Sequence, residues 1–166
     1  MTISHPITHH SFNDLLTLAK KEVDELFPWD VEELIEEGHD LLIIDVREPY
    51  EYKKMRIKDS INVPRGVLET ACEWAFDETV PELVMARNKK VLVVCRSGNR
   101  SVFAVQTLAQ MGFKQAYSLQ TGLRGWNEYD MPLVNDDGEV DVDDADVYHE
   151  SKISPEQMGP QISEPD

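Results

Sequence analysis

Apolar and polar positions follow two different periods along the chain, which predicts short buried strands separated by helices. The runs 41–44 and 91–94 are continuously apolar, which is typical of buried strands, and residues 61–64 and 116–119 are the other strand candidates. Helical spacing or capping signals give the helix candidates 11–26, 29–38, 49–55, 100–111 and 122–127, with two short helices within 66–88. This alternation predicts an α/β fold with a central parallel sheet of about five short strands and helices on both faces.

The N-terminal segment, residues 1–28, is expected to be an extension with one helix. Ser11 and Asp14 have the spacing of a capping box, and an apolar stripe continues to Leu26 before Pro28 ends the helix. Three histidines (His5, His9 and His10) precede it, but no cysteine or carboxylate nearby completes a ligand set. We therefore expect a solvated terminus and no metal site there.

Acidity is concentrated at the other end of the chain. The net charge is −16, and residues 128–166 contain 13 acidic side chains against one lysine, Lys152. Such a composition buries too little to offset the entropy of ordering, so residues 135–166 are expected to be an acidic tail that is disordered or loosely docked. A calcium loop around Asp137 is disfavoured because the EF-hand spacing is missing. The negative charge also argues against nucleic acid or an anionic membrane as partner.

Residues 29–134 remain as the single expected domain. Its two cysteines, Cys72 and Cys95, lie in different contexts and do not form a disulfide framework, which suits a reducing compartment. The sequence shows neither a leader-like N-terminus nor an apolar run of the ~18 residues that span a bilayer. A cytoplasmic location is therefore expected, and the oligomeric state is open.

Cys95 lies at a tight turn between the buried strand 91–94 and the helix from Arg100. Backbone N–H groups of such a turn point inward, and the helix N-terminus adds partial positive charge. Two arginines, Arg96 and Arg100, flank the same turn. These features favour a thiolate with an anion bound beside it. Cys72 has no such context and is expected to be a small buried hydrophobe.

Ligand sites in parallel sheets form at the carboxyl ends of strands. Two other strand ends therefore belong beside Cys95: Asp45 and Arg47 after one strand, and the segment 122–126 with Trp126 after another. Asp45 is expected to be structural, whereas Arg47 either ties strand ends together or adds charge to the pocket. Trp126 is expected to brace the loop by packing.

Four segments together resemble a single-domain rhodanese: Asp-Val-Arg-Glu-Pro at 45–49, Ile-Asn-Val-Pro at 61–64, Cys-Arg-Ser-Gly-Asn-Arg-Ser at 95–101 and Gly-Leu-Arg-Gly-Trp at 122–126. The resemblance covers about 29–132, and Thr121-Gly122 replaces the two glycines that the family often has. It implies a rhodanese-like fold and a sulfurtransferase that forms a persulfide on Cys95. The implied donor is thiosulfate or a similar anion, and the implied acceptor is cyanide, glutathione or a thioredoxin-like thiol, without cofactor or metal.

The persulfide loop implied by this resemblance consists of Arg96, Ser97, Gly98, Asn99, Arg100 and Ser101. Its backbone N–H groups are expected to stabilise the negative terminal sulfur, and the arginines to hold the sulfonate-like oxygens of the donor.

Two alternatives stay open. A rhodanese-like domain can be a binding or regulatory module, or a persulfide carrier for a protein partner, although the intact Cys95 favours catalysis. Phosphatase or arsenate-reductase activity is weaker, because relatives that hydrolyse phosphate esters have a loop one residue longer. The chain also lacks an aspartic acid inside or just after the loop to protonate a leaving group.

Overall fold

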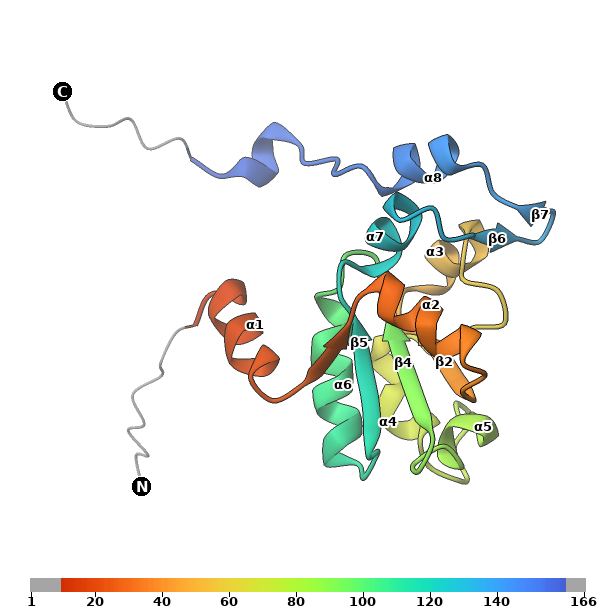
Figure 1. Ribbon diagram of the computed structural model, residues 1–166. Coiled ribbons are helices and arrows are strands. Elements are labelled where there is room, and N and C mark those ends of the chain that lie inside the picture. The colour runs from red at the N-terminus through yellow and green to blue at the C-terminus, as the bar shows by residue number, and fades with distance from the viewer. Residues whose placement is uncertain (1–9, 161–166) are drawn as a thin grey trace, which may run out of the picture.

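A five-stranded parallel sheet forms the centre of the molecule in a computed structural model that describes residues 10–160 (Figure 1). The strand order is β1-β5-β4-β2-β3. The strands are β1 (Asp24–Leu26), β2 (Leu41–Asp45), β3 (Ile61–Asn62), β4 (Lys90–Val94) and β5 (Gln115–Leu119). The α/β prediction with helices on both faces is thereby confirmed.

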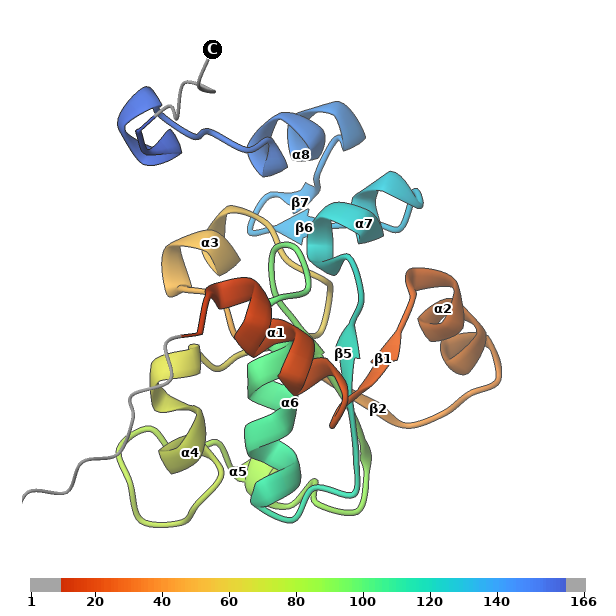
Figure 2. The same cartoon turned by 90° about the vertical axis from the view of Figure 1, so that its left-hand side faces the viewer.

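Helices cover the two faces of this sheet unequally. On one side lie α4 (Leu68–Ala71), α5 (Pro81–Val84) and α6 (Arg100–Gln110), with α1 (Phe12–Lys20) outside α6 (Figure 2). On the other side lie α2 (Pro28–Glu36) and α7 (Gly122–Glu128), and α3 (Pro49–Lys54) follows β2. The two short helices expected within 66–88 are α4 and α5, preceded by a 3₁₀ turn, η1 (Arg65–Val67).

The period-2 alternation of strand side chains divides the core into two layers. Val91 and Val93 of β4 belong to the apolar cluster under α4 and α6, whereas Leu92 and Val94 belong to the cluster under α2 and α7. All four side chains are fully buried. A strand buried on both faces explains why the run 91–94 is continuously apolar.

The helix expected over 11–26 is wrong beyond Lys20. The capping box is confirmed, with the Ser11 hydroxyl accepting from the Asp14 N–H at 3.1 Å. After the helix, however, the chain adds β1 to the edge of the sheet, where Asp24–Leu26 pairs with Tyr117–Leu119 of β5. The alternative backbone partner comes from a strand about 90 residues away in sequence, so the local apolar spacing could not reveal it.

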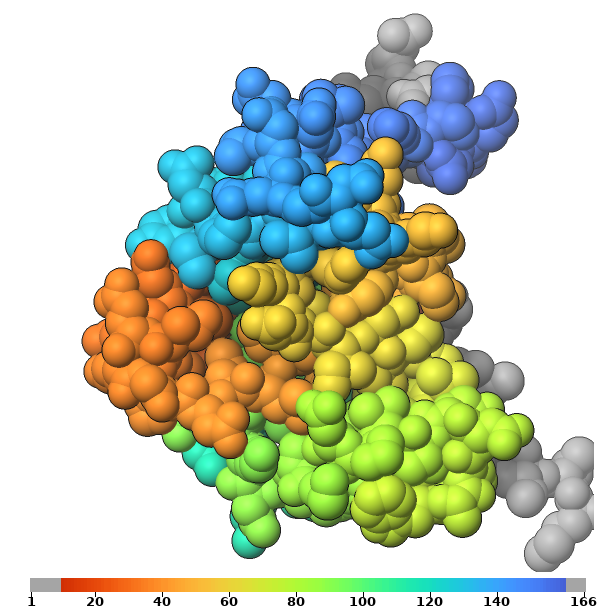
Figure 3. Space-filling view, turned by 90° about the vertical axis from the view of Figure 1, so that its right-hand side faces the viewer, coloured from red at the N-terminus to blue at the C-terminus, as the bar shows by residue number. Residues whose placement is uncertain are grey.

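The expectation of a disordered tail from residue 135 does not hold for residues 135–149. β6 (Val134–Asn135) and β7 (Gly138–Glu139) form a hairpin, and α8 (Val142–His149) follows it. A 3₁₀ turn, η2 (Pro155–Met158), lies further on. The hairpin is joined to the segment after α3 by two hydrogen bonds of 2.8 Å between the backbones of Arg56 and Val134 (Figure 3).

This segment is ordered because a few apolar side chains are enough to hold it when they pack against a surface that the domain already presents. Ala145 is fully buried in the cluster that contains Trp126 and Leu123 of α7, and His149 is 1% exposed. The Asn127 amide of α7 donates to Val142 O at 3.2 Å and to Asp146 Oδ1 at 2.6 Å. Composition alone averages over these particular contacts, so it predicted disorder.

Within residues 10–160, no helix has the length and apolar character needed to cross a bilayer. The same residues contain no group of three or more His, Cys, Asp or Glu side chains arranged to hold a metal ion. His5 and His9 lie outside the described residues, and His10 is exposed.

Candidate active site

Cys95 follows β4 directly, and its Sγ lies inside the loop that leads to α6. The N–H groups of Gly98 and Ser101 donate to Sγ at 3.2 and 3.4 Å. Gly98 has φ +89°, a left-handed conformation that glycine adopts without a steric penalty. The turn therefore aims two backbone donors at one sulfur atom, as the strand-turn-helix pattern predicts.

A pair of buried hydroxyls extends this arrangement into the core. Ser101 Oγ lies 3.3 Å from Cys95 Sγ and 2.7 Å from Ser118 Oγ, and both serines are fully buried. Either serine can donate in the hydroxyl pair, so Ser101 can donate to a sulfur anion while accepting from Ser118. Ser118 lies on β5 and was missed from the sequence. Its only signal is a small polar residue between Tyr117 and Leu119 of the predicted strand.

The N-terminus of α7 fixes the other side of the loop. The N–H groups of Leu123 and Arg124 donate to the carbonyl oxygens of Cys95 and Arg96 at 2.9 and 3.0 Å. Gly122 has φ +60°, and a Cβ placed there would lie 2.5 Å from the Arg96 carbonyl carbon and oxygen. Thr121 before it also has positive φ, at 71°. Close backbone approach thus explains why segment 122–126 belongs to the site.

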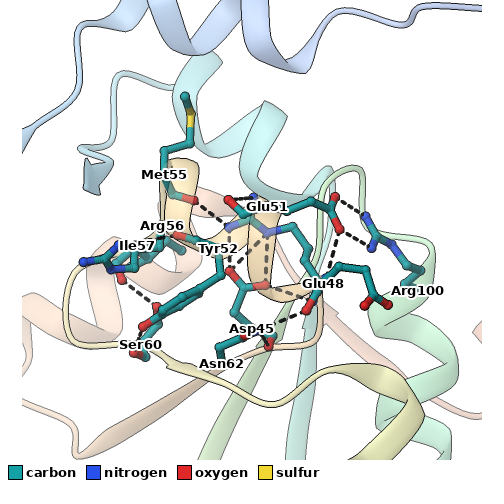
Figure 4. A network of polar contacts seen from close by, with 11 residues as sticks. Asp45, Glu48, Glu51, Tyr52, Met55, Arg56, Ile57, Ser60, Asn62 and Arg100 are labelled. Atoms are coloured by element: carbon teal, nitrogen blue, oxygen red, sulfur yellow. Dashed lines mark hydrogen bonds and ion pairs between the residues drawn. The ribbon is translucent and has the colours of Figure 1, made fainter. Parts of the chain in front are cut away.

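Asp45 and Arg47 form a buried ion pair at the end of β2 (Figure 4). Both side chains are 0% exposed, and Arg47 Nη2 lies 2.8 Å from Asp45 Oδ2. The remaining donors of Arg47 reach carbonyl oxygens of α3 and its end, Glu51 O at 3.4 Å and Met55 O at 2.7 Å. The pair therefore holds α3 against the strand ends, and Arg47 presents no exposed surface to a ligand.

Arg100 is bound by a carboxylate that the sequence did not single out. Its two terminal nitrogens each lie 2.9 Å from an oxygen of Glu51, a bidentate ion pair between α6 and α3. Burial alone would raise the pKa of Glu51, but the hydrogen bonds from Arg100 and from the Glu48 N–H outweigh it and lower that pKa. The hydrogen bond to Glu51 likewise raises the pKa of Arg100. The guanidinium is thus partly neutralised, and its expected role in anion binding stays a prediction.

Arg96 also has a partner inside the protein. Its Nη2 donates to His149 O at 2.8 Å and Glu150 O at 2.7 Å, at the C-terminal end of α8. Ser97 is exposed, and Asn99 precedes the first residue of α6. Of the expected loop donors, therefore, the backbone points at sulfur, whereas the two arginine side chains are directed to protein groups.

Two other expectations concern packing. Trp126 is 2% exposed and lies in the apolar cluster that contains Val94, and its indole N–H donates to Pro132 O at 3.0 Å. It supports the end of β4 from the α7 side. Cys72 is fully buried, and burial raises the pKa of its thiol to about 11, in keeping with an unreactive core residue.

The comparisons with known proteins agree on one protein family. Residues 28–129 match the family model of the rhodanese-like domain. A protein of Allochromatium vinosum named sulfurtransferase is 25% identical over 116 residues, which cover 70% of this chain and 99% of that protein. MOCS3 of Arabidopsis thaliana, named adenylyltransferase and sulfurtransferase, is 32% identical over 103 residues and 58% of this chain.

A solved structure from Rhodopseudomonas palustris, described as a protein of unknown function and possible tyrosine phosphatase, superposes with a TM-score of 0.68. It has 26% sequence identity, with 78% of this chain and 98% of that chain covered. The matched residues span 44% of the Bacillus subtilis protein YrkF and 22% of MOCS3, so the chain covers less than half the length of these curated relatives.

Proposed function

The chain belongs to the rhodanese-like domain family, and on that premise we propose that it is a sulfurtransferase working through a persulfide on Cys95. The observation that carries the proposal is the convergence of the Gly98 and Ser101 N–H groups on Cys95 Sγ. Thiosulfate, or a similar sulfane-sulfur anion, is the proposed donor. Cyanide or a thiol, such as glutathione or a thioredoxin-like protein, is the proposed acceptor.

The first half-reaction is a displacement at sulfur. The Cys95 thiolate attacks the sulfane sulfur of thiosulfate, a new S–S bond forms, the donor S–S bond breaks, and sulfite leaves with the electron pair. The Gly98 and Ser101 N–H groups and the Ser101 hydroxyl lie against Cys95 Sγ, where preorganised donors stabilise the thiolate that attacks the donor. In the second half-reaction the acceptor attacks the outer sulfur and the Cys95 thiolate is regenerated.

A persulfide adds one sulfur atom, about 32 Da, to a single peptide, and the thiolate is the nucleophile that forms it. We expect intact-mass and tryptic-peptide analysis to find this adduct on Cys95 after incubation with thiosulfate. It should be absent in Cys95→Ala and retained in Cys72→Ala, the matched control. An unmodified wild-type protein with every donor tried, or an equal adduct in Cys95→Ala, would refute the proposal.

Turnover separates the remaining candidates. Thiosulfate and mercaptopyruvate are tested as donors against cyanide, glutathione and thioredoxin, with p-nitrophenyl phosphate as the phosphatase control. A stable persulfide that passes to none of the small acceptors would favour a carrier for a protein partner. Phosphate release that depends on Cys95 would favour the phosphatase instead.

A further inference from the structure

Residues 142–152, which we call the C-terminal strap, lie beyond the region that matches the rhodanese-like domain. They cross the carboxyl end of the sheet, next to α7 and above the Cys95 loop (Figure 1). The strap consists of α8 and the three residues that follow it. Ala145 and His149 anchor it from below because both are buried, while Lys152 is exposed.

The strap is attached to the catalytic loop itself. The side chain next to the nucleophile, Arg96, binds the carbonyl oxygens of His149 and Glu150 at 2.8 and 2.7 Å. A cation that binds the last carbonyls of a helix also interacts favourably with the helix dipole. The position of the loop and the position of the strap are therefore coupled through one guanidinium group.

A cavity of about 300 Å³ lies between the strap, α3 and the loop. Its lining residues are Tyr50, Glu51, Arg96, Tyr148, Glu150 and Lys152. Glu51 is already paired with Arg100. Among residues 10–160, neither Arg96 nor Lys152 forms an ion pair. The lining has two cationic and two anionic side chains, but Glu51 is paired with Arg100 outside it, so the lining charges without an ion-pair partner among residues 10–160 are Arg96 and Lys152 against Glu150.

We propose that the anionic sulfur donor approaches Cys95 through this cavity, which adjoins the loop at Arg96 and not at Cys95 itself, and that Lys152 of the strap is the residue that attracts the anion. The proposal rests on the proposed function for the identity of the donor, but not for the electrostatics. Arg100 is held by Glu51 and Arg96 by the strap, so Lys152 is the lining cation that remains free to approach a ligand. The negative charge of Glu150 opposes the positive charge of Lys152. The two side chains together therefore set the preference of the cavity for anionic or neutral molecules.

The charge preference can be measured without sulfur transfer. Cys95 is alkylated with iodoacetate, an anion, and with iodoacetamide, its neutral counterpart, and the tryptic peptide 91–96 is quantified by mass spectrometry. Loss of one charge beside a partly solvated cavity changes the local concentration of a monoanion by about two- to fivefold at low salt. We expect Lys152→Gln to slow iodoacetate by this factor and Glu150→Gln to speed it, with iodoacetamide unchanged in both.

Lys114→Gln is the matched control, because Lys114 is also exposed and lies at the opposite end of β5. Both strap substitutions preserve the hydrogen bonds between Arg96 and the strap, because Arg96 binds the backbone oxygen of Glu150 and not its carboxylate. As a second readout, sulfite, the leaving group, is titrated calorimetrically. We expect its dissociation constant to rise about two- to fivefold in Lys152→Gln and to be unchanged in Lys114→Gln.

The inference is overturned if the iodoacetate-to-iodoacetamide ratio of Lys152→Gln equals that of the wild type and of Lys114→Gln. It is equally overturned if Cys95 reacts with neither reagent and sulfite does not bind, since the cavity would then admit no anion. A wild type that takes no sulfur from thiosulfate but shows the expected charge preference refutes the donor assignment alone. The two failures are therefore distinguishable.

Discussion

Gly122 is the position at which one added methyl group most directly tests how the active loop is held. The Cβ of Gly122→Ala would lie 2.5 Å from the Arg96 carbonyl and 2.6 Å from the Cys95 carbonyl oxygen, both of them backbone groups. Backbone atoms held by the hydrogen bonds of Leu123 and Arg124 cannot rotate away as a flexible side chain could. The loop and the start of α7 must therefore separate.

Two separate costs contribute to the loss of stability expected for Gly122→Ala. A non-glycine residue at φ +60° costs about 1 kcal/mol. Overpacking against a rigid neighbour costs a further ~1–3 kcal/mol. We expect Gly122→Ala to lower the free energy of unfolding by about 2–4 kcal/mol, measured by urea denaturation. Persulfide formation on Cys95 should slow by on the order of tenfold or more, because displacement of the loop moves the donors from Sγ.

Gly112→Ala supplies the control for the backbone contribution. Gly112 has φ +89°, and an added Cβ would meet no heavy atom within 4 Å. Its expected cost is about 1 kcal/mol with normal persulfide formation. The difference between the two variants measures the close approach of α7 to the loop. Equal unfolding free energies, with unimpaired persulfide formation in Gly122→Ala, would refute the reasoning.

Two further predictions concern the strap and the ion pair beside the loop. A chain that ends after Val140 should lose about 2–3 kcal/mol of unfolding free energy, because it exposes the surface under Ala145 and deprives Arg96 and Asn127 of their partners. A chain that ends after Lys152 is the control. Equal denaturation midpoints for the two chains would contradict docking of α8. Glu51→Gln should cost about 1–2 kcal/mol at pH 7. Since the pKa of Glu51 is lowered in the folded state, its contribution is present above the ordinary carboxyl range and is lost as the pH falls through the lowered value. The difference from wild type should therefore shrink below about pH 4, and a difference that stays constant with pH would count against the ion pair.

Much of the fold could be predicted from local sequence patterns, because several elements are specified by residues that are close together in the chain. The continuous apolar runs of β2 and β4 and the capping box of Ser11 and Asp14 all depend on nearby residues. The position of Cys95 at the end of a buried strand follows from the same patterns. Their physical basis lies in burial and backbone sterics, both of which act within a few residues.

The errors arose where a distant partner decided the outcome. The segment Asp24–Leu26 is a strand because β5 offers an open edge, and the acidic α8 is ordered because α7 presents Asn127 and an apolar surface. Glu51 and Ser118 could not be recognised as site residues, since their partners Arg100 and Ser101 are 49 and 17 residues away.

The sequence by itself determined the proposed nucleophile, the loop that surrounds it and the order of strands and helices that places this loop at the carboxyl edge of a parallel sheet. Only the tertiary structure decided what the charged side chains of that loop do. Arg100 is neutralised by Glu51, Arg96 binds the end of α8, and Lys152 is brought to the cavity by the strap. A charge acts through distance to other charges, and those distances exist only once segments remote in the sequence are packed together.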